Sequence, residues 1–248
     1  MKHLDLRRTF LWLTVFSIAM AYLESAVVVY LRAILYPGGF DFPLAPMQPG
    51  IAVTEVFREA ATIVMLLGAG YLGGRYLTQR FAWFIYCFAV WDIFYYVFLK
   101  ILVNWPASLM TWDILFLIPT TWTGPVIAPV IVSFTMILLA LVIIIRDKTH
   151  ESVNINLREW LLLITGSLII LLAFVWDYSV FLLRHYSFGE LLILPDKNAL
   201  LELSQQYIPE RFPWLIFALG ETVILLAIGL FFRRYGKNPD RVSNPVRV

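Results

Sequence analysis

Six long apolar stretches run through the sequence, and they limit what the chain can fold into. About 20 apolar residues in a helix cross the hydrocarbon core of a bilayer. Only a helix or a closed barrel satisfies the backbone hydrogen bonds there. We therefore predict an all-α integral membrane protein with six transmembrane helices, folded as one domain over residues 1–248. The predicted spans are residues 9–36, 51–73, 81–103, 125–145, 159–183 and 213–232.

The composition agrees with this class and excludes others. Hydrophobic residues make up 60% of the chain, which is more than soluble domains contain. The net charge of +2 is too small to predict a nucleic-acid partner. Cys87 is the single cysteine, so an internal disulfide and a cysteine-rich metal cluster are excluded.

The basic residues predict the orientation. If the N-terminus is cytoplasmic, most lysines and arginines fall in cytoplasmic segments, as the positive-inside rule requires. We therefore predict a multi-pass protein of the cell (inner) membrane with both termini in the cytoplasm. A cleaved secretory signal ending near Ala19-Met20-Ala21 is the alternative. The apolar run continues to about Tyr36, however, and this favours a first span.

Residues 105–118 are apolar, but the segment is too short to cross a bilayer. Asn104 suits the cap of a helix, and Pro106 suits its first turn. We therefore predict a short interfacial or re-entrant helix on the outer side. Asp113 lies within this segment; it could reach the mouth of a polar cavity, but a solvated side chain is the simpler interpretation.

Carboxylates inside the spans are the strongest functional signal. A charge at the bilayer centre costs at least about 2.5–3.5 kcal/mol, so it persists when it is paired, faces a protein interior or has a function. Five of the six spans carry such an acid, most of them in the outer half of the membrane. The residues are Glu24, Glu55, Glu59, Asp92, Asp177 and Glu221, with the basic residue Arg58 among them. We predict that they converge on one polar cavity that opens to the outer side.

Within this set, Glu55, Arg58 and Glu59 stand at i, i+3 and i+4, on one face of a helix. A structural cluster in which Arg58 is neutralised by both carboxylates is the alternative to a binding site. So many acids cannot all be ionised in a low-dielectric pocket, which makes proton exchange with a bound cation plausible chemistry. We predict Trp91, Tyr96 and Trp176 as walls of the pocket.

Three functions remain open at this point, because the chain contains no H-E-x-x-H, G-x-S-x-G, Walker A or dinucleotide-binding motif. The first is a proton-coupled transporter or binding protein for a cation or cationic solute. The second is an intramembrane enzyme that uses carboxylate acid–base or metal chemistry on a lipid or isoprenoid. The third is a non-catalytic subunit of a membrane complex.

The sequence predicts little about the ligands and partners of the protein. No cofactor is certain, although carboxylates can hold a divalent cation. The expected partners are the lipid bilayer and a small cationic or lipid-like ligand. A homo-oligomer or a larger membrane complex is also compatible with the sequence.

Overall fold

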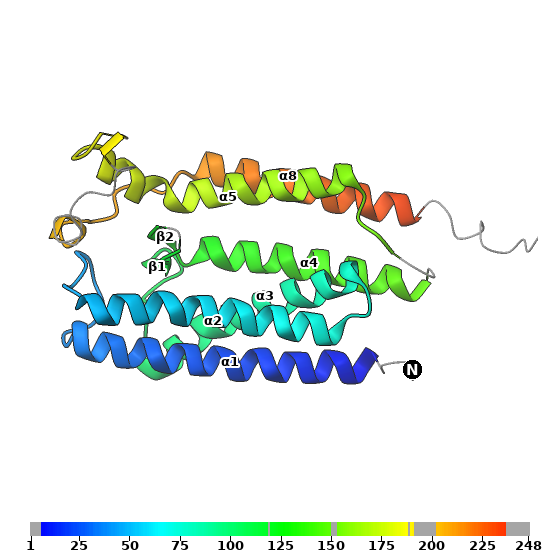
Figure 1. Cartoon of the computed structure of the whole chain (residues 1–248), viewed down its shortest axis with the longest axis horizontal. Helices are drawn as coiled ribbons and strands as arrows, with labels where there is room; N and C mark the ends of the chain where they lie inside the picture. Colours follow the sequence, from blue (N-terminus) through cyan, green and yellow to red (C-terminus); the bar gives the residue numbers. More distant parts are fainter. Residues whose placement is uncertain (1–5, 119, 150–152, 188, 191–201, 237–248) are drawn as a thin grey trace, which may run out of the picture.

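The structure is a computed structural model that describes residues 6–118, 120–149, 153–187, 189–190 and 202–236. Six long helices run along one axis (Figure 1). Each of them covers one of the predicted apolar stretches. The helices are α1 (Leu6–Leu35), α2 (Pro49–Gly73), α3 (Leu77–Val103), α4 (Ile127–Thr149), α5 (Leu157–Leu183) and α8 (Trp214–Gly236).

Five of these helices, α1, α3, α4, α5 and α8, are long and apolar enough to cross a membrane. The fold is therefore that of a mostly helical, multi-pass membrane protein. The remaining long helix, α2, carries Glu55, Arg58 and Glu59 in its first half, which lowers its apolar character. The sixth span and the cytoplasmic location of both termini stay predictions.

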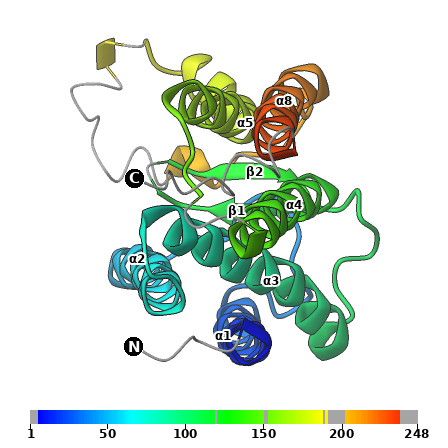
Figure 2. The same ribbon diagram turned by 90° about the vertical axis from the view of Figure 1, so that its right-hand side faces the viewer.

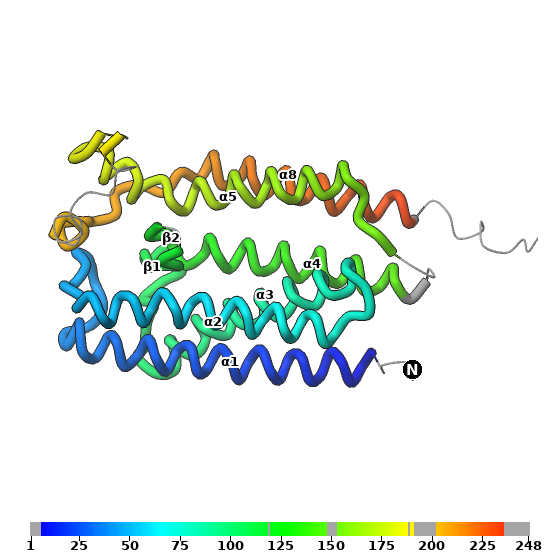
Figure 3. Tube along the Cα trace, in the orientation of Figure 1, coloured from blue at the N-terminus to red at the C-terminus, as the bar shows by residue number. Residues whose placement is uncertain are grey.

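The helices form two groups with α3 and α4 in the middle. Helices α1, α2 and α4 pack on α3, and α5 packs on α8. Seen along the bundle, α3 and α4 lie between the α1–α2 side and the α5–α8 pair (Figure 2). Helices α5 and α8 run antiparallel. The start of α1 and the end of α8 lie at the same end of the bundle (Figure 3). The other end of the bundle carries the end of α1 and the start of α8.

A β-hairpin lies at that opposite end, where a short helix was predicted. Strand β1 (Trp112–Phe116) pairs antiparallel with β2 (Trp122–Pro125), so the predicted helix at residues 105–118 is wrong. Asn104 does not start a helix; it ends α3 in the left-handed region, with φ of 53°. The physical reason is composition, because aromatic and branched residues favour strands once a second strand satisfies their backbone groups.

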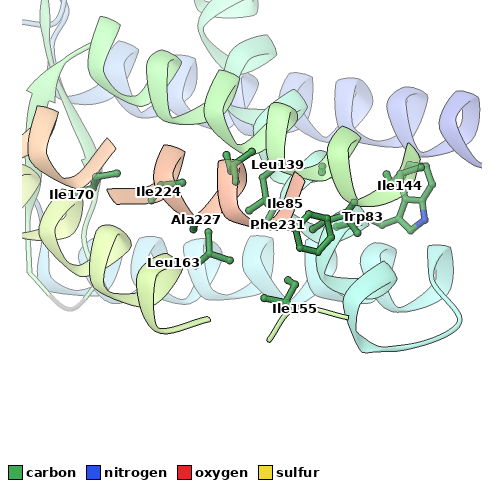
Figure 4. Packing of buried hydrophobic residues seen from close by; sticks show 14 of the residues in the cluster. Trp83, Ile85, Leu139, Ile144, Ile155, Leu163, Ile170, Ile224, Ala227 and Phe231 are labelled. Atoms are coloured by element: carbon green, nitrogen blue, oxygen red, sulfur yellow. The ribbon is translucent and has the colours of Figure 1, made fainter. Parts of the chain in front are cut away.

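The main hydrophobic core lies between the two groups of helices. Figure 4 shows side chains such as Ile85, Leu139, Leu163 and Phe231, which come from α3, α4, α5 and α8. Lipid tails are as apolar as these side chains, so close packing of small residues drives helix association in a bilayer. Gly166 of α5 and Gly220 of α8 allow the two helices to approach closely. A Cβ on Gly166 would lie 2.9 Å from the Gly220 carbonyl oxygen, so a larger residue would not fit.

Candidate functional site

A cavity of about 140 Å³ lies between α1, α2, α3 and strand β1, and we call it the acidic cavity. It has room for several waters or one small polar group. Five carboxylates and two guanidinium groups line it, together with aromatic side chains. The charged lining residues are Glu24, Arg32, Glu55, Arg58, Glu59, Asp92 and Asp113.

Arg58 is the centre of one ion-pair cluster in this cavity. Its guanidinium group pairs with Glu24 of α1 and with Glu55 of its own helix. The Arg58 Nε–H also donates to Glu55 Oε2 at 2.9 Å, and the Thr62 hydroxyl donates to Glu24 Oε2 at 3.2 Å. Arg58 is thus neutralised by two carboxylates, and the cluster joins α1 to α2.

Arg32 and Asp113 form a second ion pair, which sequence reasoning did not place in the site. Arg32 Nη2 lies 3.1 Å from Asp113 Oδ1, and the Arg32 guanidinium lies over the rings of Trp105 and Phe40. Asp113 is buried rather than solvated, with 2% of its surface exposed. Burial raises the pKa of Asp113 to about 6, although the nearby Arg32 acts to lower it. The predicted helix gave no indication that Asp113 is buried. Because alternate residues of a strand face one side, a strand prediction would have indicated it.

Two further carboxylates of the acidic cavity are held by neutral donors. Glu59 Oε2 accepts a hydrogen bond of 2.9 Å from the backbone N–H of Leu117, directly after β1. Asp92 Oδ2 accepts a hydrogen bond of 2.8 Å from the Ser133 hydroxyl of α4. Within the described residues, neither acid forms an ion pair. Arg58 is the nearest basic residue to Glu59 along the helix, and its guanidinium is paired with Glu24 and Glu55 instead.

A second, larger cavity of about 380 Å³ lies next to the first, between α3, α4, α5, α8 and the hairpin. We call it the apolar cavity, because most of its lining is aliphatic or aromatic. Trp91, Asp92, Leu115 and Phe116 line both cavities, so Asp92 lies where they meet. Glu221 also lines the apolar cavity, and its Oε2 accepts a hydrogen bond of 2.7 Å from the Thr135 hydroxyl.

Several buried polar atoms at the two cavities have no hydrogen-bond partner in the described part of the chain. An unpaired buried donor or acceptor costs about 1–3 kcal/mol, so such atoms mark places where a ligand or water can bind. The atoms in the acidic cavity are Arg32 Nη1, Trp91 Nε1 and Asp113 Oδ2. Those of residues lining the apolar cavity are Trp91 Nε1, Trp122 Nε1 and Glu221 Oε1.

The structure brings together most of the predicted site residues but not all of them. Asp177 lies outside both cavities and accepts hydrogen bonds from the Tyr207 hydroxyl and the backbone N–H groups of Glu210 and Arg211. It therefore ties the end of α5 to the segment before α8. Trp176 is 41% exposed and is not among the described lining residues, whereas Trp91 and Tyr96 line the acidic cavity.

Apart from Asp177, the predicted charged residues thus divide between the two cavities. Glu24, Glu55, Arg58 and Glu59 lie at the acidic cavity, Asp92 lies at both cavities, and Glu221 lies at the apolar one. Among the residues that the structure describes, no group of three or more His, Cys, Asp or Glu side chains is arranged to hold a metal ion. The contacts that these side chains make are ion pairs and hydrogen bonds.

Comparison with known protein families, curated proteins and solved structures found no match to this chain.

Proposed function

We propose that this protein binds a cation or cationic solute in the acidic cavity and couples its transport to proton exchange. The observation that carries the proposal is the excess of carboxylates over bases around one buried space. Arg58 forms ion pairs with Glu24 and Glu55, and Arg32 forms one with Asp113. Glu59 and Asp92 are the carboxylates of the cavity that form no ion pair among the described residues.

Glu59 and Asp92 are suited to this exchange for a physical reason. An ionised carboxylate away from water is costly unless a positive charge is near it. Each of these two acids accepts hydrogen bonds from neutral donors only. The charge of Arg58 acts on Glu59 from the same helix, but the Arg58 guanidinium is already paired with Glu24 and Glu55. Each of the two acids therefore either carries a proton or pairs with a bound cation, and the arrival of one releases the other. The aromatic rings of Trp91, Tyr95 and Tyr96 line the same cavity and offer faces that attract a cation.

The proposed orientation places this cavity on the outer side of a six-span protein. The acidic cavity includes β1, and the hairpin lies at the end of the bundle opposite the start of α1 and the end of α8. With both termini in the cytoplasm, that end faces outward. A solute from outside would then reach Glu59 and Asp92 before it meets the apolar inner half.

The test is a flux measurement on the full chain in liposomes, with tetramethylammonium as the probe cation. A tetramethylammonium gradient should drive proton movement, read by a pH-sensitive dye inside the liposomes. The combined variant Glu59→Gln and Asp92→Asn should abolish this movement. Glu210→Gln is the matched control, because Glu210 is an exposed partner of Arg184. Proton movement that survives in the combined variant, or none in the unaltered protein, would contradict the proposal.

One observation favours a second candidate, an intramembrane enzyme that acts on a lipid or isoprenoid. Asp92 lies where the acidic and apolar cavities meet, which is where the head and chain of such a substrate would join. A protonated carboxyl group at that point can act as a general acid. Lipid extracts from cells lacking the protein should then differ from those of cells that produce it, and production of Asp92→Asn in the cells lacking the protein should not remove this difference.

A further inference from the structure

The apolar cavity extends along the bundle, away from the hairpin. Its lining on α3 runs from Phe81 to Asp92, a distance of roughly 16 Å at the rise of a helix. The facing walls come from α4, α5 and α8. Figure 4 shows Ile85, Leu139 and Leu163 among the side chains of this region. The cavity is therefore elongated and leads from the charged site into the inner half of the molecule.

The size and lining of this cavity indicate what it accommodates. Protein interiors are close-packed, with few voids larger than a water molecule. A volume of about 380 Å³ lies within the range of small-molecule sites, which is about 300–1,000 Å³. Apolar cavities do not hold water well. A hydrocarbon chain fits both the shape and the chemistry of the space.

Two polar atoms of lining residues limit the ligand further. Trp122 Nε1 and Glu221 Oε1 are buried and have no hydrogen-bond partner in the described residues. Glu221 is 7% exposed, so water does not solvate it freely. A plain hydrocarbon would leave both atoms unpaired. A ligand with an oxygen function, such as an ester, can accept from the indole N–H, and a protonated carboxyl can donate to it.

We propose that the ligand is a cationic amphiphile, with its head in the acidic cavity and its chain in the apolar cavity. The four residues that line both cavities, Asp92 among them, lie where head and chain join. The ester or similar oxygen function lies beside Trp122 and Glu221. The inference depends on the proposed function for the head site, and it adds the substrate class.

The test uses the full chain in lipid nanodiscs and a long-chain acylcholine with a photoreactive diazirine near the end of its chain. After irradiation, labelled peptides are identified by mass spectrometry. Label should appear on residues of α3, α4 and α5 that line the apolar cavity, such as Phe84, Met136 and Ser167. An excess of free choline should reduce this label several-fold, because choline competes for the head site only.

Two variants of adjacent residues on α5 provide the contrast. Ser167 lies at the exposed edge of the apolar cavity, so Ser167→Phe narrows the cavity there and should reduce the label several-fold. Leu168→Phe should leave the label unchanged, because Leu168 is 59% exposed and does not line the cavity. Met136→Trp fills the cavity from α4 and replaces Ser167→Phe if that variant does not fold. Binding of choline itself, measured by calorimetry, should survive in the cavity-filling variant.

These measurements separate the two proposals. Choline binding together with label that neither the filling variant nor choline reduces would overturn the amphiphile inference and leave the cationic head site standing. Absence of choline binding in the unaltered protein would overturn the head site and the inference with it. Label lost in Ser167→Phe and kept in Leu168→Phe, with choline bound in both, supports the inference.

Discussion

At the scale of single residues, the acids of the acidic cavity fall into two kinds. Glu24, Glu55 and Asp113 each form an ion pair with an arginine; the pairs of Glu24 and Asp113 connect separate elements of the fold, and the pair of Glu55 lies within α2. Glu59 and Asp92 accept hydrogen bonds from neutral donors and form no ion pair among the described residues. The first kind holds the cavity together, and the second kind is available to a ligand. The distinction gives different expectations for substitutions within one cavity.

Substitution of Arg58 should destabilise the protein strongly. Arg58→Gln leaves Glu24 and Glu55 as buried charges without a partner, a change that costs about 3–5 kcal/mol when such a pair is broken. Arg184→Gln is the matched control, because Arg184 and Glu210 are 53% and 61% exposed. Exposed pairs contribute little to stability, because water and salt screen them. Thermal unfolding in detergent measures both, and an equal loss in the two variants would contradict the assignment of Arg58.

Stability should depend on pH through Asp113. Burial raises the pKa of Asp113 from its ordinary value of 3.8 to about 6. The folded chain therefore holds this proton at pH values where the unfolded chain has lost it, so stability falls as pH rises from about 4 to 6 and then levels off. In melting temperatures measured across this range, Asp113→Asn should lose that part of the slope. Arg32→Gln should extend the slope to higher pH, because Arg32 lowers the pKa of Asp113. A wild-type slope in Asp113→Asn would contradict the prediction.

The sequence predicts some of these pairings and hides others. The spacing of Glu55 and Arg58 at i and i+3 predicts their contact, because it depends on one helix alone. The contact of Arg58 with Glu24 depends on how α1 and α2 pack on α3, which no local pattern records. Asp177 shows the same limit, because its partners are backbone groups of a distant segment.

At the scale of elements, helices could be predicted more securely than the hairpin. Long apolar runs are independent of their surroundings, and each of them became a helix. The five residues of β1 do not predict a strand by themselves, because a short strand is stable only when it pairs with a second one, here β2. The hairpin matters for function, because it brings Asp113 into the acidic cavity and Trp122 to the apolar one.

The contact between α5 and α8 should depend on two glycines. A Cβ at Gly220 would lie 2.7 Å from Ile170 Cγ1 and 2.9 Å from the Gly166 carbonyl oxygen, so the helices would have to separate. Overpacking of this kind costs about 1–3 kcal/mol. Gly220→Ala should therefore lower the thermal stability of the detergent-solubilised protein. Gly229→Ala on the same helix meets nothing within 4 Å and should stabilise it by up to about 1 kcal/mol. Equal effects of the two changes would show that the close approach is unimportant.

At the scale of the whole molecule, the arrangement of helix groups explains why two cavities exist. The acidic cavity lies where α1, α2 and α3 meet the hairpin, and the apolar cavity lies between the α3–α4 pair and the α5–α8 pair. The sequence showed the acids at similar depths, but it could not show that they divide between two spaces.

The orientation of the whole molecule gives the last prediction. Six spans place the ends of the chain on one side, and five would place them on opposite sides. In a Cys87→Ser background, Gly38→Cys between α1 and α2 should react with an impermeant maleimide added outside intact cells. Leu77→Cys, at the start of α3 and 72% exposed, should react only after the membrane is opened. Gly38 has open space around it, so the change itself should be tolerated. If both cysteines react from the same side, α2 does not cross the membrane, and the acidic cavity cannot be the outward-facing entrance that the transport proposal requires.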